Sequence, residues 1–249
     1  MRKKQKKKNK NFLTSIICLI LIIALVYSVF KIFKWNKENS SNNKISDKIN
    51  ENVTVKKDAG GKENFSINFD ELKKQNNDTV AWLKVNNTNI KYPIVKAKDN
   101  SFYLTHSFDK SYNSAGWIFA DYKNKFDDTD KNIVIYGHNR RDGSMFSSLK
   151  NALNPNWYNN DLNRNILFYT ENGRYNYQIF SIYKIEDEDY YIKTGFNDET
   201  DFEDFLNIIT KRSVQDFEIN VSKEDSILTL STCANNNKYR VVIHAKKSL

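Results

Sequence analysis

The stretch Leu228-Thr-Leu-Ser-Thr-Cys233 ends an apolar, β-prone run in a cysteine, and Arg240 follows seven residues later. A second run of this kind, Ile133–Tyr136, ends in Gly137-His138, which places the histidine 95 residues upstream of the cysteine. A thiol, an imidazole and a guanidinium, each at the edge of an expected strand, are the groups that acyl transfer through a thioester requires. The pattern makes Cys233 a candidate nucleophile.

In this chemistry each of the three residues has a defined role. Cys233 attacks a carbonyl, and His138 protonates the leaving nitrogen and then deprotonates the incoming one. Arg240 offers a planar fork of donors for an oxyanion or a substrate carbonyl. Taken singly, each residue also has an ordinary explanation, because a lone strand cysteine is often a small buried hydrophobe and the other two are often packing or solvated residues.

The N-terminal segment has the features of a membrane anchor. Residues 1–10 carry seven Lys/Arg, and the nineteen residues of Phe12–Phe30 carry no charge. About 20 apolar residues span the hydrocarbon core of a bilayer, and flanking positive charge keeps a terminus in the cytoplasm. We expect a cytoplasmic basic tail at 1–11, a signal-anchor at 12–33 and an extracellular remainder at the cell membrane. A cleaved signal peptide is the alternative, but the run is long for one and lacks a small-x-small cleavage site.

The rest of the chain divides by composition. Residues 34–62 are rich in Lys, Asn, Ser and Asp, which predicts a polar, partly helical stalk. Residues 63–249 have a net charge of −2, so nothing argues for a nucleic-acid surface. Of the two cysteines, Cys18 lies in the expected anchor, which leaves Cys233 without a disulfide partner in the exported domain. An unpaired thiol outside the cell is best explained by reactivity.

Residues 63–249 predict a mainly β (α+β) domain. Glu171-Asn-Gly-Arg174 contains the Asn-Gly signal of a tight hairpin turn. Helical spacing is expected at 70–74, at 144–152 and at 201–211, the last with one apolar face of Phe202, Phe205, Leu206 and Ile209. The expected strands cover 90–95, 117–120, 133–136, 166–169, 175–185, 227–230 and 239–245.

Several linked motifs in this order resemble the sortases, the membrane-anchored cysteine transpeptidases of Gram-positive bacteria. The resemblance runs from about residue 69 to residue 245 and is closest to class B, of a clostridial type. Serine at position 231 is the usual choice of that class. The motifs are Asp78-Thr-Val-Ala-Trp82, Thr88-Asn-Ile-Lys-Tyr-Pro93, Asn100-Ser-Phe-Tyr-Leu104, Gly116-Trp-Ile-Phe-Ala-Asp121, Tyr136-Gly-His138 with the loop to Phe146, and Thr229-Leu-Ser-Thr-Cys233 with its following arginine.

The resemblance implies a sortase-type eight-stranded β-barrel with N-terminal helices and a few peripheral helices. It implies a transpeptidase that cleaves an Asn-Pro-x-Thr-x or related Pro-x-Thr sorting motif of exported proteins through an acyl-enzyme. A cell-wall amine, supplied by a peptidoglycan precursor, then resolves the thioester. The implied catalytic residues are His138, Cys233 and Arg240, with no cofactor and no metal. The implied peptide groove is lined by Asn100, Leu104, Tyr136, Tyr191, Ile192 and Ser231.

Other side chains are given structural roles. His106 and His244 match no catalytic motif, and the acidic run 186–189 is expected to be a surface loop rather than a calcium site. The interval from Cys233 to Arg240 is shorter than in typical sortases, which leaves the substrate less defined than the catalytic residues.

Three alternative functions stay open at this point. The first is a pilin-polymerising sortase that uses a lysine nucleophile. The second is an inactive sortase-like surface binding module, against which the intact catalytic residues argue. The third is a papain-like hydrolase, but such enzymes carry the nucleophile near the start of a helix, whereas Cys233 follows a strand.

Overall fold

The computed structural model of the chain describes residues 2–51, 53–57, 63–127, 129–186, 188–233 and 239–248. Within these ranges, only the backbone is described for 2–11, 56–57, 63–64 and 233. The chain forms two compact units, Met1–Lys44 and Ile45–Leu249.

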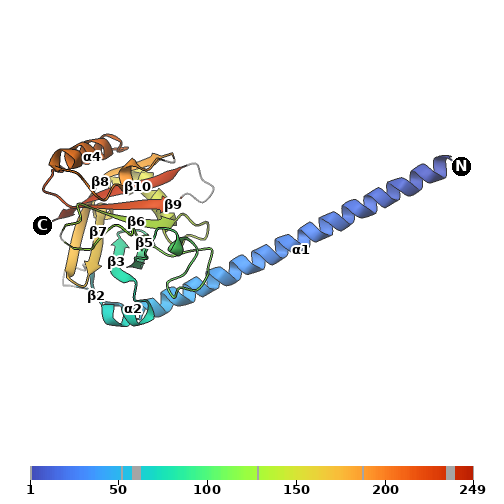
Figure 1. The fold of residues 1–249 in the computed structure, drawn as a ribbon, viewed down its shortest axis with the longest axis horizontal. Helices are drawn as coiled ribbons and strands as arrows, with labels where there is room; N and C mark the ends of the chain where they lie inside the picture. The colour runs from blue at the N-terminus through green and yellow to red at the C-terminus, as the bar shows by residue number, and fades with distance from the viewer. Residues whose placement is uncertain are drawn as a thin grey trace. The chain divides into compact units, whose positions relative to one another are not determined.

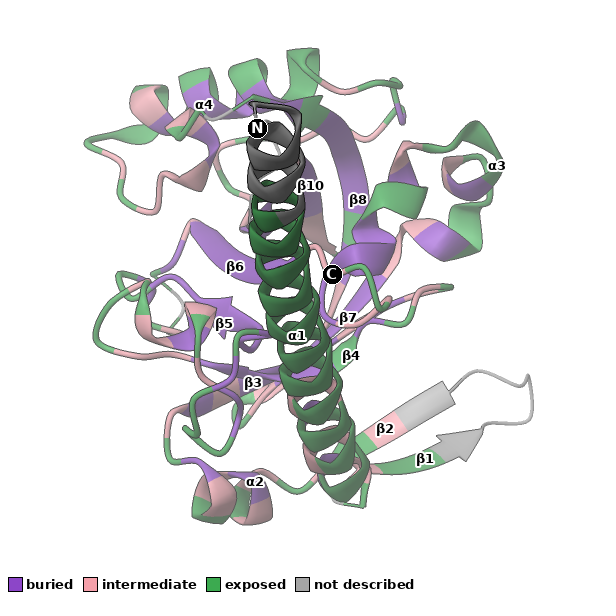
Figure 2. Ribbon diagram, turned by 90° about the vertical axis from the view of Figure 1, so that its right-hand side faces the viewer, coloured by how far each residue is buried: buried purple, intermediate pink, exposed green. Residues whose placement is uncertain are grey.

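The first unit consists of helix α1 (Arg2–Asn50), whose last residues belong to the second unit. From Phe12 to Phe30 every side chain is exposed, and Figure 2 shows most of the described helix in the colour of exposed residues. Among the described residues this is the one helix long and apolar enough to cross a membrane. Exposed apolar side chains over that length are stable in lipid rather than in water, which makes the segment a candidate membrane anchor.

The second unit begins inside the segment expected to be a polar stalk. Its part of α1 buries Ile49 in the hydrophobic core, with 2% of the residue exposed. An antiparallel hairpin of β1 (Val53–Lys57) and β2 (Glu63–Ile67) follows. Phe65 of the hairpin packs on Trp82 with ring centroids 4.9 Å apart. The packed core therefore includes residues upstream of position 63.

Eight strands close into a barrel, which confirms the expected fold (Figure 1). Most neighbours are antiparallel, but the β4–β5 and β6–β9 pairs are parallel. Parallel neighbours need long crossover connections. The β4–β5 crossover ends at Phe119 and the β6–β9 crossover begins after His138, and both of these residues line the candidate site. In the order in which they close the barrel, the strands are β10 (Arg240–Ser248), β8 (Gly173–Ile185), β7 (Asn165–Thr170), β3 (Thr79–Val85), β4 (Lys91–Val95), β5 (Phe119–Ala120), β6 (Asn132–His138) and β9 (Ile227–Cys233).

After α1, the helices are short except for α4 (Glu199–Lys211), which begins at the N-cap Asp198. The four apolar residues expected on one face of α4 are all buried, against Phe180, Tyr183 and Val242. This packing confirms the predicted amphipathic helix. The other helical segments of the second unit are α2 (Phe69–Gln75), η1 (Phe102–Leu104), η2 (Ser147–Leu153), α3 (Pro155–Tyr158), η3 (Asp161–Arg164) and η4 (Tyr190–Ile192).

One expected helix differs in type and position. The pattern at 144–152 forms the 3₁₀ helix η2 at Ser147–Leu153. Asn154 then adopts an extended conformation, which the following Pro155 favours sterically. Pro155 starts the separate helix α3, so the segment cannot continue as one α-helix.

Candidate active site

Strand β9 lies between β6 and β10, and the candidate nucleophile is its last residue. In the parallel β6–β9 pair, His138 is the register partner of Cys233. In the antiparallel β9–β10 pair, the register runs from Lys246–Ile227 to Val242–Ser231. Beyond it, the backbone N–H of Val241 donates a hydrogen bond of 2.8 Å to Oγ1 of Thr232, and Arg240 and Cys233 are the sequence neighbours of these two residues. Neighbouring strands lie about 5 Å apart. The backbone of Cys233 thus lies beside that of His138 and near that of Arg240, although its side chain lies outside the described residues.

A cavity of about 570 Å³ opens at these strand ends. Seven of the nine residues singled out from the sequence line this cavity. Tyr191 is not among the lining residues, and the side chain of Cys233 is not described. The cavity combines an apolar wall with hydroxyl, amide, imidazole and guanidinium groups. Its lining consists of Asn100, Leu104, Thr105, Ser114, Phe119, Tyr136, His138, Ile192, Ser231, Thr232 and Arg240.

The ring of His138 is held in one tautomer by a backbone carbonyl. Its Nε2 lies 2.8 Å from the carbonyl oxygen of Leu104, and because that oxygen can only accept, Nε2 carries the hydrogen. Nδ1 is buried and has no hydrogen-bond partner among the described residues. Burial lowers the pKa of His138, and Arg140 lowers it further, against the opposite effect of the Leu104 carbonyl. At neutral pH the ring is therefore mainly neutral, with the lone pair on Nδ1.

Gly116 leaves room for the His138 ring and the Leu104 carbonyl because it has no side chain. Gly116 has a φ of +60°, and a Cβ placed there would lie 2.8 Å from the Leu104 oxygen and 2.9 Å from Cδ2 of His138. It would also lie 2.5 Å from the carbonyl oxygen of Tyr103. Only glycine fits both this backbone conformation and this space.

Asn100 and Tyr136 are joined beneath the cavity by a buried carboxylate. Oδ2 of Asp121 accepts hydrogen bonds from the Tyr136 hydroxyl and from Nδ2 of Asn100, each at 2.8 Å. The Asn100 carbonyl oxygen accepts from the backbone N–H of Tyr122 at 3.0 Å. These contacts fix the orientation of the Asn100 amide, so the N–H that remains is a donor for a ligand carbonyl.

Tyr191 lies behind the cavity wall rather than in it. The residue is fully buried, and its hydroxyl shares a hydrogen bond of 2.9 Å with the hydroxyl of Ser231. It also lies 3.5 Å from Nη1 of Arg240. The structure thus brings Tyr191 to two site residues and not to the cavity itself.

Comparisons with known proteins agree with this geometry. The model of the sortase domain family matches residues 83–248. The chain belongs to the sortase family. Sortase B of Listeria monocytogenes is 42% identical over 181 residues, which are 71% of this chain and 72% of that protein. The chain is therefore a class B sortase, and sortases are cysteine transpeptidases.

Solved structures of class B sortases share the fold at similar identity. A crystal structure of Clostridium perfringens sortase B is 37% identical, with a TM-score of 0.69, and covers 73% of this chain and 100% of that one. A Staphylococcus aureus sortase B–substrate complex is 34% identical, with a TM-score of 0.68, and covers 72% of this chain and 84% of that one.

Some residues of this site were not singled out from the sequence. Thr105, Ser114, Phe119 and Thr232 line the cavity, and Asp121 lies under it. Ser114 and Thr105 belong to the β4–β5 crossover, whose path depends on the tertiary fold. Asp121 ends a motif that carries the family resemblance, and a buried acid directly after a strand is the signal that could have identified it.

The other two histidines lie away from the cavity lining. His106 stacks on Phe102 at 4.1 Å, and its Nδ1 is 2.8 Å from the Phe102 carbonyl oxygen. His244 is fully buried between the hydroxyls of Tyr183 and Thr229, each 2.8 Å from one ring nitrogen. Burial lowers its pKa to about 3, so the ring stays neutral. The described residues contain no group of ligands that could hold a metal ion.

Replacing Asp121 by asparagine is expected to weaken peptide binding more than turnover. The carboxylate accepts three donors, the third being the backbone N–H of Lys123 at 2.9 Å. An amide supplies one acceptor oxygen, so either the Lys123 N–H or both the Asn100 and Tyr136 donors face an N–H₂ group, and the network that orients the Asn100 amide is weakened. We expect KM for a cleaved sorting peptide to rise about tenfold, with kcat changed less than about threefold.

The control for this variant is Asp127→Asn, which alters an exposed turn carboxylate bonded to the backbone N–H of Thr129. Steady-state kinetics and a thermal melt of both variants separate binding from folding. A KM of Asp121→Asn equal to that of Asp127→Asn contradicts the assigned role of Asp121.

Proposed function

We propose that this sortase cleaves a sorting motif of the Asn-Pro-x-Thr-x or a related Pro-x-Thr kind in exported proteins and transfers them to a cell-wall amine. The acyl group is carried as a thioester on Cys233. The observation that carries the proposal is the pairing of His138 with Cys233 at the ends of two parallel strands that border one cavity.

The first half-reaction uses His138 as an acceptor and then as a donor of one proton. The neutral ring accepts the thiol proton of Cys233 at Nδ1 as the sulfur attacks the peptide carbonyl carbon. The resulting imidazolium gives this proton to the nitrogen of the leaving amine as the C–N bond breaks. The products are a thioester on Cys233 and a free amine, with His138 neutral again.

Arg240 stabilises the negative charge that develops on the carbonyl oxygen during this step. Its guanidinium is charged at every relevant pH and lines the same cavity as His138. Nη1 of Arg240 lies 3.5 Å from the hydroxyl oxygen of the buried Tyr191, which supports the guanidinium on the side away from the cavity. A donor held in place before the reaction stabilises the transition state without reorganisation.

The cavity supplies complementary groups for a short peptide. Leu104, Phe119 and Ile192 offer apolar contacts, which suit a proline ring and the methyl group of a threonine. Asn100 contributes an oriented N–H donor for a peptide carbonyl. The S. aureus sortase B, a relative with this fold, has been solved as a substrate complex, which supports substrate binding by such a site.

The second half-reaction reverses the roles. An incoming amine attacks the thioester, neutral His138 accepts the proton that the nitrogen loses, and the Cys233 sulfur leaves and is reprotonated. The amine comes from a peptidoglycan precursor, and the exported protein becomes joined to the cell wall. The N-terminal helix holds the enzyme at the membrane where such precursors are presented, with the basic tail in the cytoplasm and the catalytic unit outside.

A peptide assay tests the motif and the acceptor. The full chain in detergent micelles is incubated with fluorogenic Asn-Pro-x-Thr-x, Leu-Pro-x-Thr-Gly and Ser-Pro-x-Thr-Gly peptides, each with triglycine or with a peptide that carries a free lysine ε-amine. We expect cleavage of a Pro-x-Thr motif and a new amide product by mass spectrometry. If no peptide is cut or transferred, the proposed activity is wrong, and a product formed with the ε-amine alone favours the pilin-polymerising function.

Deleting residues 1–33 is expected to release the protein from membranes. The deletion removes the whole run of exposed apolar side chains that only lipid can cover. Cell fractionation should find the full chain in the membrane pellet and the shortened chain in the soluble fraction. Recovery of the intact full chain from the medium contradicts the anchor.

A further inference from the structure

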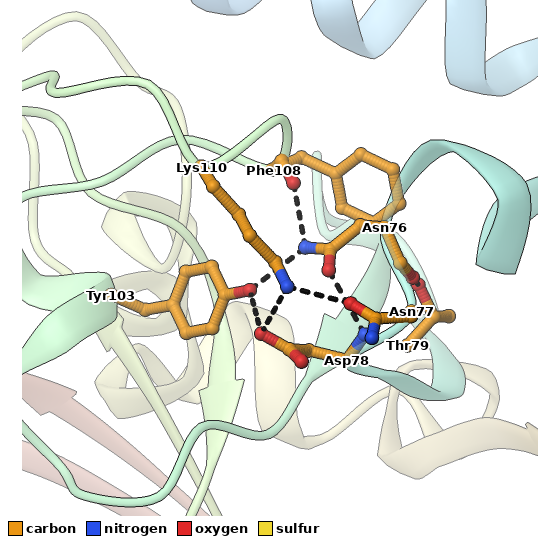
Figure 3. Close-up of polar contacts among 7 residues, drawn as sticks. All are labelled: Asn76, Asn77, Asp78, Thr79, Tyr103, Phe108 and Lys110. Atoms are coloured by element: carbon orange, nitrogen blue, oxygen red, sulfur yellow. Dashed lines mark hydrogen bonds and ion pairs between the residues drawn. The ribbon is translucent and has the colours of Figure 1, made fainter.

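A polar cluster fixes the start of the β4–β5 crossover, the segment that carries η1. Tyr103 of η1 is fully buried, and its hydroxyl donates a hydrogen bond of 2.7 Å to Oδ2 of Asp78. The same hydroxyl accepts one of 2.8 Å from Nδ2 of Asn76, as Figure 3 shows. Lys110, from the later part of the crossover, lies 3.0 Å from the same Asp78 oxygen. The cluster thus joins the crossover to the corner between α2 and β3.

Asn76 uses both of its side-chain N–H hydrogens and its side-chain oxygen in this cluster. Its Nδ2 donates its second hydrogen to the carbonyl oxygen of Phe108 at 2.6 Å, and its Oδ1 accepts from the backbone N–H of Asp78 at 2.9 Å. Burial raises the pKa of Tyr103, so its hydroxyl keeps the proton that it donates. A buried cluster in which each partner is satisfied holds its members rigidly.

The backbone of η1 connects the polar cluster to the proposed catalytic histidine, His138. The carbonyl oxygen of Tyr103 accepts a hydrogen bond of 2.9 Å from the backbone N–H of Trp117. The next carbonyl, that of Leu104, is the acceptor for Nε2 of His138 at 2.8 Å. Ser101 and Thr105, on either side of η1, are both exposed, so the buried Tyr103 side chain, with its hydroxyl bonded in the cluster, anchors this turn.

We propose that Tyr103, held by Asp78 and Asn76, is a positioning residue that keeps the Leu104 carbonyl on Nε2 of His138 and thereby leaves Nδ1 free for proton transfer. This inference rests on the proposed role of His138 as proton donor and acceptor. It adds three residues that touch neither the peptide cavity nor the reacting atoms.

The physical reason is the small energy difference between the two neutral imidazole tautomers. A hydrogen bond from Nε2–H to a fixed carbonyl favours one tautomer, and a shifted carbonyl releases that preference. A ring with its hydrogen on Nδ1 cannot accept the thiol proton there. Loss of the Tyr103 anchor therefore lowers kcat. Of the groups proposed to bind the peptide, Leu104 is the one that this change reaches, and Asn100, Phe119 and Ile192 stay in place.

The same change alters the acidity of His138. The Leu104 carbonyl favours the protonated ring, so its displacement lowers the pKa of His138 further. Among the described side chains, Arg140 on the following loop also lowers the pKa of His138, and Arg240 and Tyr136 line the same cavity. Cys233 is the register partner of His138 on the neighbouring strand, with its side chain outside the described residues. None of these is altered by a substitution at Tyr103.

The test uses Tyr103→Phe in the full chain in detergent micelles. We expect kcat for a cleaved sorting peptide to fall about tenfold with KM changed less than about twofold, and the His138 limb of the pH–kcat/KM profile to move to lower pH. Tyr177→Phe is the matched control, because it removes a buried hydroxyl that lines a separate cavity with Asp130 and Phe168.

A second readout does not depend on turnover. With only three histidines in the chain, ¹⁵N-histidine labelling resolves the tautomer of His138 by NMR, and we expect the Nε2–H form in the wild type and a mixture in Tyr103→Phe. Asp78→Ala, at a partly exposed residue, should reproduce both effects, and the double variant should add little to either.

The outcomes distinguish the proposed function from the positioning role. If the wild type turns over no peptide, the proposed function fails, while the NMR comparison still tests the positioning role. If Tyr103→Phe keeps the wild-type tautomer and pH profile, or loses activity only in proportion to its thermal stability as Tyr177→Phe does, the positioning role is overturned.

Discussion

Cys233→Ala is expected to lower kcat/KM for a cleaved sorting peptide by about 10⁴-fold or more, the largest effect of any single substitution in this sortase. The variant removes the sulfur that is proposed to form the thioester, and the other cysteine of the chain lies in α1. His138, Arg240 and the cavity remain, so peptide binding should persist. The measurement is the initial rate of fluorogenic cleavage by the full chain in micelles.

The other cysteine of the chain, Cys18, offers a matched control. Cys18→Ala removes a thiol from the exposed part of α1 and should leave the rate unchanged. The wild type is mixed with the substrate peptide in the absence of an amine and then digested with a protease. Mass spectrometry should show the acyl group on the enzyme fragment that contains residue 233. Cleavage that persists in Cys233→Ala, or an acyl group found elsewhere, would refute the thioester mechanism.

The parts of the fold that follow from local pattern were predictable from sequence. The apolar face of α4 is buried as its spacing indicates, and the turn at Glu171-Asn172 joins β7 to β8 where Asn-Gly predicts a hairpin. The runs that end in His138 and Cys233 both form strands. Their parallel pairing was not visible in either run alone, because it depends on a crossover of more than 80 residues.

The contacts that support the site were not predictable, because their partners lie far apart in sequence. Asn76 and Tyr103 meet only after the β4–β5 crossover has folded against the end of α2. The strand β3 was not recognised, because its pattern is largely buried and does not alternate between apolar and polar positions. The family resemblance implied that Tyr191 lines the groove, but a motif match does not indicate which of Tyr191 and Ile192 is buried, and in the structure Tyr191 is the buried one.

Gly116→Ala is expected to destabilise the folded enzyme and to slow catalysis at the same time. The φ of +60° costs an alanine about 1–2 kcal/mol, and the contacts of its Cβ with two backbone carbonyl oxygens add about 1–3 kcal/mol. Backbone atoms cannot move aside as a flexible side chain can. A total of about 3 kcal/mol corresponds to a fall in Tm of about 6–12 °C for a domain of this size.

Alanine substitutions at two other glycines separate the backbone and steric causes of the fall in Tm. Gly143 has a φ of +85°, and no atom lies within 4 Å of the place that a Cβ would take, so Gly143→Ala should show the cost of the backbone conformation alone. Gly195 has open space and no positive φ, so Gly195→Ala should change Tm little. The difference between Gly116→Ala and Gly143→Ala then measures the steric contribution.

The effect of Gly116→Ala on rate follows from which atoms the new methyl group meets. It contacts the Leu104 carbonyl oxygen and Cδ2 of His138, so both partners of the tautomer-fixing hydrogen bond must move apart. A displacement of about 1 Å in a catalytic group can cost about 100-fold in rate, and we expect a loss of that size in kcat at temperatures where the variant is folded. A folded Gly116→Ala variant with wild-type kcat would show that the position of the His138 ring tolerates the shift, and the proton-transfer role of its Nδ1 would then have to be assigned to another group.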